Sequence, residues 1–275
     1  MTFDPASYVF TQPSAPTAIR ASTVLPAHRE NVELRTSDGH RLVGELAIPE
    51  SGEIKATLIT LHPLPTHGGF MDSHVYRKAS YRLPALAGIA VLRFNTRGTS
   101  SPRGTSGGAF EEGIGERMDV EAAVQFAVDR GLPNRWLVGW SFGTELALMY
   151  GAAEPVASEI EGAILLSPPL HRATDVHLKE WAQAGKPLKV LVPEHDDYLQ
   201  PAAAAARFAL VPQAQVLGVD GAKHLWVGEK YAGRVLNEIV DEVIPGSARS
   251  GNAGSASAGT ELPQEWDGPV ATAHA

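Results

Sequence analysis

The sequence contains no cysteine. Disulfide bonds, zinc sites built from thiolates and a cysteine nucleophile are therefore excluded. The chain also lacks a run of apolar residues long enough to cross a bilayer. Basic residues are in the minority, because 23 Lys and Arg stand against 31 Asp and Glu and leave a net charge of −8. This balance argues against nucleic acid and anionic membranes as partners, since both bind clustered positive charge.

The two ends of the chain differ in composition from the middle. Residues 1–25 are rich in Pro, Ser and Thr and predict an arm outside the core. They lack a charged segment followed by an apolar one, so we expect no secretory signal and a cytoplasmic protein. Residues 246–275 are rich in Gly, Ala and Ser without an apolar period, and they predict a disordered tail. The sequence thus predicts one domain over 26–245.

Strand and helix patterns alternate along that domain. "NVELRT" and "HRLVGELAI" flank a turn and predict an antiparallel hairpin. The later apolar runs "ATLITL", "IAVLRF", "WLVGW", "GAILLS", "LKVLV" and "AQVLGV" are continuous, which is typical of strands buried on both faces of a parallel sheet. Helical periods fall at 73–87, 116–130, 142–153, 202–210 and 226–243. We therefore expect an α/β fold, with a mainly parallel, doubly wound sheet entered through an N-terminal hairpin.

A serine lies at one strand-to-helix junction of this scheme. In "WLVGWSFGTELALMY", Ser141 follows a predicted strand and precedes a predicted helix, with Gly139 and Gly143 two residues away on either side. This pattern is typical of a nucleophile elbow, in which a sharp turn exposes the serine above the sheet and small neighbours prevent a clash. The alternative is a glycine-flanked helix cap, because serine is also a good N-cap residue. The strand, the glycine spacing and the helix together favour a nucleophile.

A serine hydroxyl needs a base, and the base needs a carboxylate that orients it. In this architecture the chain order is serine, acid, histidine. The acid is expected after "LKVLV", where "PEHDDYLQP" offers the adjacent Asp196 and Asp197. The histidine is expected after "AQVLGV", where "DGAKHLW" supplies His224. Both positions fall at carboxyl ends of predicted strands, where sheets of this kind bind ligands.

The loop after "ATLITL" is the expected source of one oxyanion-hole donor. In "HPLP", Leu64 can donate its backbone N–H, whereas the flanking prolines cannot. The alternative is a proline-stiffened turn without a catalytic donor. The second donor is expected from the backbone N–H of Phe142 at the helix N-terminus.

The same loop contains three histidines, His62, His67 and His74. Their spacings of five and seven residues match no helical pair of metal ligands, and few acids are nearby. We therefore expect no metal site.

Six segments together resemble the α/β-hydrolase superfamily, in particular a small bacterial branch without a lid: "HPLPTHGG", "VLRFNTRGTSSPRG", "GIGERMD", "GWSFG", "PEHDDYLQP" and "GAKHLW". The resemblance covers about residues 32–243. It implies the α/β-hydrolase fold, with Ser141 as nucleophile, Asp196 as acid and His224 as base. Leu64 and Phe142 would donate the oxyanion hole.

The resemblance leaves Asp197 as the alternative acid, one residue further along the chain. It also implies that Arg97 and Gly98 shape the loop after the second parallel strand, and that Glu116 and Asp119 cap and charge a helix N-terminus. The chain departs from the family in two places. "HPLP" replaces the frequent "HPHP", which removes a polar side chain, and Pro193 stands where a glycine often precedes the acid.

These observations favour a serine hydrolase that cleaves small carboxylic esters through an acyl-enzyme on Ser141, without a cofactor. The expected partner is a small-molecule ester, and the sequence leaves the oligomeric state open. The connection "PPLHRATDVHLKEWAQAGK" has room for one short helix at 175–184 and for no large cap domain, so we expect short, soluble substrates. The alternatives are another acyl or C–C transfer by the same triad, such as perhydrolysis, and a non-catalytic α/β-hydrolase that binds a ligand.

Overall fold

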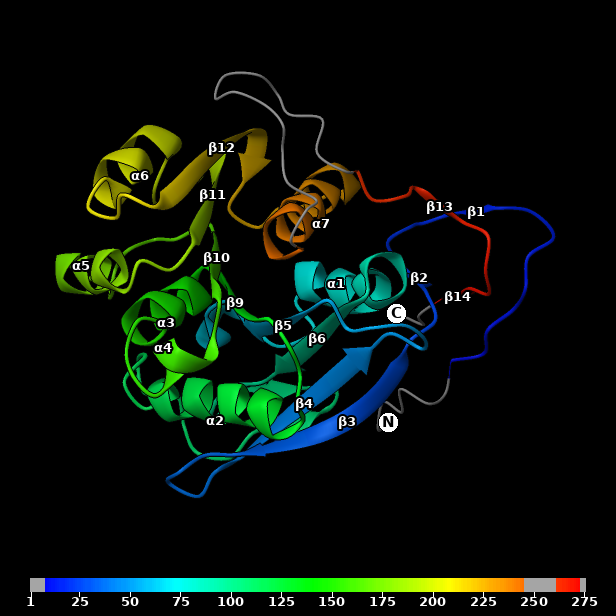
Figure 1. Cartoon of the computed structure of the whole chain (residues 1–275), viewed down its shortest axis with the longest axis horizontal. Helices are drawn as coiled ribbons and strands as arrows, with labels where there is room; N and C mark the ends of the chain where they lie inside the picture. Colours follow the sequence, from blue (N-terminus) through cyan, green and yellow to red (C-terminus); the bar gives the residue numbers. More distant parts are fainter. Residues whose placement is uncertain (1–7, 245–260, 273–275) are drawn as a thin grey trace.

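An eight-stranded sheet forms the centre of the molecule (Figure 1). The computed structural model describes residues 8–244 and 261–272. The strand order is β12-β11-β10-β9-β5-β6-β4-β3. The strands are β3 (His28–Arg35), β4 (Arg41–Ile48), β5 (Ala56–Leu61), β6 (Ile89–Phe94), β9 (Arg135–Trp140), β10 (Gly162–Leu166), β11 (Leu188–His195) and β12 (Ala214–Lys223).

The sheet is parallel from β6 to β12 and antiparallel at its N-terminal edge. β3 pairs antiparallel with β4, and β4 pairs antiparallel with β6. The remaining neighbours, β6-β5-β9-β10-β11-β12, are all parallel. β5, β6 and β10 are buried along their whole lengths, which explains why their sequences are continuously apolar. The predicted mainly parallel sheet with an N-terminal hairpin is confirmed.

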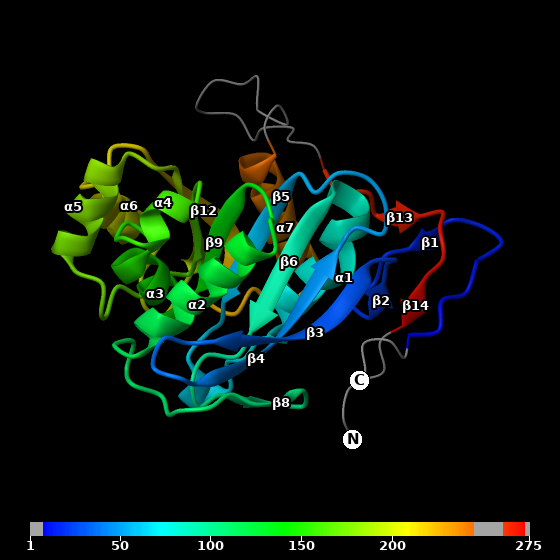
Figure 2. The ribbon, with the colours of Figure 1, turned by 60° about the horizontal axis from the view of Figure 1, so that its bottom comes forward.

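Helices cover both faces of the sheet, as Figure 2 shows from a second direction. α1 and α7 pack on one face in an apolar cluster with Trp226, and the other helices contribute to the cluster on the opposite face. The helices are α1 (His74–Ala87), α2 (Glu116–Asp129), α3 (Phe142–Tyr150), α4 (Val156–Glu159), α5 (Asp175–Ala184), α6 (Pro201–Phe208) and α7 (Glu229–Val243).

Only a short helix lies between β10 and β11. α5 has the bounds that the sequence predicts, and no large cap domain is inserted there. The helix begins with a capping box, in which the backbone N–H of Thr174 donates to Nδ1 of His177 at 3.0 Å. The connection between β10 and β11 therefore places no lid over the edge of the sheet that carries the strand ends.

Part of the expected tail is ordered, which corrects the sequence prediction for residues 261–272. β13 (Glu265–Trp266) pairs with β1 (Thr17–Ala18), and β14 (Ala271–Thr272) pairs with β2 (Thr23–Val24). Figures 1 and 2 both show this C-terminal segment beside the N-terminal arm. Each of these strands is too short to produce an apolar period, and the strand with which it pairs is distant in the sequence, so the sequence pattern does not reveal the pairing. The remainder of the predicted tail, 246–260 and 273–275, lies outside the described residues.

The N-terminal arm is also more tightly packed than its composition suggests. Val24 and Leu25 are fully buried, and Tyr8 and Tyr81 form a hydrogen bond between their hydroxyls at 2.9 Å. The Arg82 guanidinium donates to the Arg20 carbonyl at 2.9 Å. The arm thus contacts α1.

Candidate active site

Ser141 lies at a strained turn between β9 and α3. Its backbone has φ 52° and ψ −115°, a left-handed region that costs a non-glycine residue of order 1–3 kcal/mol. The flanking glycines permit this turn. A Cβ on Gly139 would lie 2.4 Å from the Gly143 carbonyl oxygen, and a Cβ on Gly143 would lie 1.8 Å from that of Leu61. The turn has the geometry of a nucleophile elbow.

Two further side chains form a hydrogen-bonded chain with Ser141. The hydroxyl Oγ of Ser141 lies 2.9 Å from Nε2 of His224, and Nδ1 of His224 lies 2.9 Å from Oδ2 of Asp196. His224 and Asp196 are both buried. They follow β12 and β11, so the structure brings together at one edge of the sheet the three residues that the sequence suggested. Asp197, the alternative acid, is exposed.

Asp196 is stabilised in its ionised form. Burial alone would raise the pKa of Asp196, but the hydrogen bonds from His224 and from two backbone N–H groups outweigh it and keep the pKa below its ordinary value. These N–H donors are Tyr198, at 2.9 Å, and Leu199, at 3.3 Å. An ionised Asp196 accepts the Nδ1 proton of His224, which leaves Nε2 free to accept the proton of Ser141.

The backbone around His224 is stabilised by three side chains that the sequence analysis did not identify. The His224 carbonyl accepts from the indole N–H of Trp140 at 3.1 Å and from the hydroxyl of Ser167 at 3.0 Å. Nε2 of His74 donates to the Leu225 carbonyl at 2.7 Å. These donors come from β9, from the residue that follows β10 and from α1, and they fix the backbone around His224 through contacts that no local sequence pattern reveals.

The loop after β5 lies beside the start of α3, because the Gly143 backbone lies against the Leu61 carbonyl. Leu64 is in this loop and directly precedes a short 3-10 helix, Pro65–His67. Phe142 is the first residue of α3, so its backbone N–H has no carbonyl four residues earlier within the helix. This arrangement is compatible with Leu64 and Phe142 as oxyanion donors.

His62 connects the β5 loop to the loop after β6. Its Nδ1–H donates to the Pro63 carbonyl at 2.7 Å, and its Nε2 accepts the backbone N–H of Thr96 at 3.0 Å. Burial lowers the pKa of His62 to about 4, although the bond to Pro63 acts in the opposite direction. His62 is therefore neutral at neutral pH, and its single proton is on Nδ1.

The acidic residues of "GERMD" differ from their expected role. Glu116 is buried, and its carboxylate accepts the backbone N–H of Glu111 and Gly113 in the loop before α2. Asp119 is also buried. Its carboxylate accepts the backbone N–H of Arg97 at 2.8 Å and a guanidinium N–H of Arg97 at 2.9 Å. The α2 N-terminus has no side-chain capping hydrogen bond, so the predicted capping is wrong, but both acids lie in the first turn of this helix, as predicted for residues that charge its N-terminus. Their carboxylates also stabilise two adjoining loops.

Glu145 is a buried acid that the sequence analysis missed. Its carboxylate accepts three consecutive backbone N–H groups of the loop after β10, from His171 at 2.7 Å, Arg172 at 3.1 Å and Ala173 at 2.6 Å. Because Glu145 is four residues after Ser141, it connects the helix that Ser141 precedes to the loop between β10 and α5.

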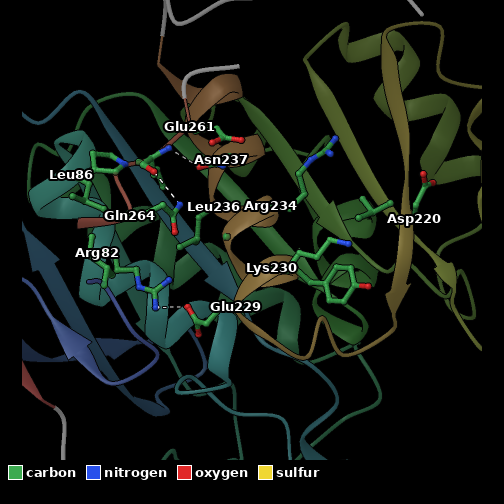
Figure 3. Close-up of a pocket in the computed structure, with 17 residues that line it drawn as sticks. Arg82, Leu86, Asp220, Glu229, Lys230, Arg234, Leu236, Asn237, Glu261 and Gln264 are labelled. Atoms are coloured by element: carbon green, nitrogen blue, oxygen red, sulfur yellow. Dashed lines mark hydrogen bonds and ion pairs between the residues drawn. The ribbon is translucent and has the colours of Figure 1, made fainter. Parts of the chain in front are cut away.

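Among the cavities formed by the described residues, two are lined by residues other than the triad. One of about 470 Å³ is lined by the loops after β5 and β6, including Pro65, Gly69 and Phe110. The Phe110 ring lies 5.3 Å from that of Phe142, so this cavity adjoins the candidate oxyanion loop. The other, of about 620 Å³, lies between α1, α7, β12 and the segment from Glu261 to Gln264 (Figure 3). Its lining carries charges of both signs and includes neither the triad nor the candidate oxyanion donors.

The three histidines near the β5 loop have separate partners. His67 bonds the Thr66 hydroxyl at 3.1 Å, whereas His62 and His74 bond the backbone groups given above. Within residues 8–244 and 261–272, no group of three His, Asp or Glu side chains is arranged to hold a metal ion. The helices of those same residues include none that is long and apolar enough to span a membrane.

Comparison with known proteins gives the fold. No protein-family model matches the sequence, and a comparison with curated proteins found no match. Among solved structures, an α/β serine hydrolase without a lid from Xanthomonas campestris is 26% identical, with 79% of this chain and 92% of that chain covered and a TM-score of 0.60. A Pyrococcus furiosus esterase is 20% identical, with 79% and 92% covered and a TM-score of 0.62.

A third structure, of an α/β serine hydrolase homologue from Coxiella burnetii, is 22% identical, with 77% of this chain and 95% of that chain covered and a TM-score of 0.62. The chain has the α/β serine hydrolase fold, in the form that lacks a lid. The resemblance inferred from the sequence motifs is confirmed at this level.

Proposed function

We propose that the protein is a carboxylesterase that hydrolyses small esters through an acyl-enzyme on Ser141. The observation that carries the proposal is the hydrogen-bonded chain from Ser141 through His224 to Asp196, with 2.9 Å at both links, at a strained elbow. Such a chain activates a hydroxyl that is otherwise a weak nucleophile at neutral pH.

The reaction follows from the direction of these hydrogen bonds. Ser141 transfers its proton to Nε2 of His224 as its Oγ attacks the ester carbonyl carbon. The oxyanion that forms is stabilised by the backbone N–H groups of Leu64 and Phe142, where the N-terminus of α3 also favours negative charge. Asp196 stabilises the imidazolium and keeps its ring oriented.

Collapse of this intermediate completes the first half of the reaction. His224 donates its proton to the departing alcohol oxygen, and the acyl group remains on Oγ of Ser141. A water molecule then attacks the acyl carbon while His224 accepts its proton. The carboxylic acid leaves, and the proton returns to Ser141. Every step uses side-chain and backbone groups of this chain, so the reaction needs no cofactor.

Small substrates are favoured by the short connection between β10 and β11. α5 is the only helix in that connection, so no cap supplies an apolar wall for a long acyl chain. Each methylene group left in water forgoes roughly 0.8 kcal/mol of binding.

The test combines a fluorophosphonate probe with turnover of p-nitrophenyl acetate. The probe is expected to label the wild type at Ser141, and Ser141→Ala is expected to lose on the order of 10⁴-fold or more in kcat. Ser158→Ala removes an exposed serine of α4 and is the matched control. Labelling of Ser141→Ala, or more than a few per cent of residual activity, contradicts the nucleophile. Absence of both labelling and turnover in the wild type favours a non-catalytic binding protein.

A further inference from the structure

Three rings form a row that ends on the catalytic base. The Tyr198 ring lies 4.7 Å from the His224 ring at an interplanar angle of 65°, and the His171 ring lies 5.4 Å from Tyr198 at 80°. Both contacts are edge-to-face, the arrangement that aromatic pairs prefer. His224 itself is buried, whereas 57% of Tyr198 is exposed. One side of the base is therefore covered by a ring that itself still faces solvent.

The backbone at both outer rings is fixed. The N–H of Tyr198 donates to Asp196, so the residue that contacts the base also orients the acid. The N–H of His171 donates to the buried carboxylate of Glu145. The row is thus a pre-formed surface, and its order does not depend on a bound ligand.

Two of the residues that follow His224 in the chain also have exposed apolar side chains. Leu225 is 54% exposed and Val227 is 69% exposed, in the loop between β12 and α7. Exposed apolar side chains this near to His224 in the chain are available to contact a ligand. A polyhydroxylated group placed there would lose hydrating water without gaining hydrogen-bond partners from Leu225 or Val227.

The chemistry of the base determines which part of the substrate meets this surface. Nε2 of His224 must reach the alcohol oxygen of the ester in order to protonate it. The departing alcohol therefore lies on the His224 side of Ser141, whereas the carbonyl oxygen points to the loop of Leu64. The side chains that surround His224 are the ones that the alcohol contacts.

We propose that Tyr198 is a specificity-determining residue that contacts the departing alcohol, and that this side of the site selects alcohols with an apolar, preferably aromatic group. The inference rests on the ester hydrolysis proposed above and names its substrate class. The favoured substrates are esters of a short acid with a benzyl-like alcohol, and esters of glycerol or sugars are disfavoured.

The experiment compares two acetates of primary alcohols, benzyl acetate and 2-hydroxyethyl acetate, which share the acyl group. The ratio of their kcat/KM values is measured for the wild type, Tyr198→Phe and Tyr198→Ala. Tyr231→Ala, which removes an α7 ring that lines the cavity of Figure 3, is the matched control. A ratio is insensitive to partial misfolding or to a poorly placed base, because both lower the two kcat/KM values equally.

The wild type and Tyr231→Ala are expected to prefer benzyl acetate, and Tyr198→Ala is expected to lose about 3- to 10-fold of that preference. Tyr198→Phe keeps the ring and should stay within about twofold of the wild type. The proposal is overturned if Tyr198→Ala lowers both kcat/KM values equally, if Tyr231→Ala changes the ratio as much, or if the wild type prefers 2-hydroxyethyl acetate.

The probe separates this proposal from the one on which it rests. If Ser141 is labelled and p-nitrophenyl acetate is hydrolysed while the ratio does not depend on Tyr198, the alcohol specificity is wrong and the esterase stands. If the wild type neither reacts with the probe nor hydrolyses any ester, both proposals are wrong.

Discussion

The variant His62→Gln is expected to lose much less stability in mild acid than the wild type does. His62 is fully buried, and its pKa of about 4 lies below the ordinary value of 6.5. Between these two pH values the unfolded chain binds a proton at this histidine and the folded chain does not. The free energy of unfolding therefore falls as the pH falls from 6.5 towards 4.

The magnitude follows from the two pKa values. At 1.36 kcal/mol for each pH unit, the full effect is about 3 kcal/mol, and about 2 kcal/mol of it appears between pH 7.5 and pH 5.0. Protonation of Nε2 would also remove the acceptor of the Thr96 N–H. This loss, too, lowers the free energy of unfolding as the pH falls. Glutamine can donate and accept hydrogen bonds but does not titrate.

Urea unfolding at pH 7.5 and pH 5.0 measures the effect in the wild type and in His62→Gln. Between pH 7.5 and pH 5.0 the free energy of unfolding of the wild type is expected to fall by about 2 kcal/mol more than that of the variant. The contributions of the other histidines are the same in both proteins and cancel in this comparison. Equal losses would refute the reasoning. NMR titration of the His62 ring in the wild type gives a second measurement, and protonation near pH 6.5 would contradict the buried, neutral state.

Three further outcomes are expected. Asp196→Asn should lower kcat for p-nitrophenyl acetate on the order of 10⁴-fold. Asp197 is exposed, so Asp197→Asn should keep kcat within about twofold of the wild type. If only Asp197→Asn loses activity, Asp197 is the acid. Gly143→Ala should lower the free energy of unfolding, measured in urea, by roughly 3 kcal/mol or more, because the new Cβ would lie 1.8 Å from the Leu61 carbonyl oxygen. Unchanged stability would show that α3 starts farther from β5. In a series of p-nitrophenyl esters, kcat/KM should stop rising before octanoate, and a continued rise or activation at an oil–water interface would reveal a long acyl groove.

The sequence predicts the sheet well because its inner strands are buried on both faces. The continuous runs of β5 and β6 are found with their predicted bounds, and α5 occupies 175–184 as expected. α7 begins at Glu229, three residues after its predicted start. Trp226 has a φ of 52°, and Gly228 precedes the helix with a φ of 106°. Both values interrupt the helix, although the apolar period continues across them.

The candidate site is predictable only where one chain segment carries the signal. Ser141 has glycines two residues away on either side, and Asp196 and His224 stand within five residues of the end of an apolar run. Tyr198 and Glu145 have no such signal, because their roles arise from contacts with loops far away in the chain. The same reason hides the pairing of 265–266 with 17–18, in which neither partner has a strand pattern of its own.

The position of β12 at the edge of the sheet determines whether activity or the global fold is lost first during unfolding. β12 is an outer strand that pairs with β11 alone within the described sheet, and His224 is the next residue after it. Asp196 follows β11, that single neighbour. Local separation of an outer strand costs less free energy than global unfolding. Loss of ester hydrolysis in rising urea should therefore precede the loss of helical circular dichroism, and enzyme assays would report on this edge of the sheet rather than on the whole domain.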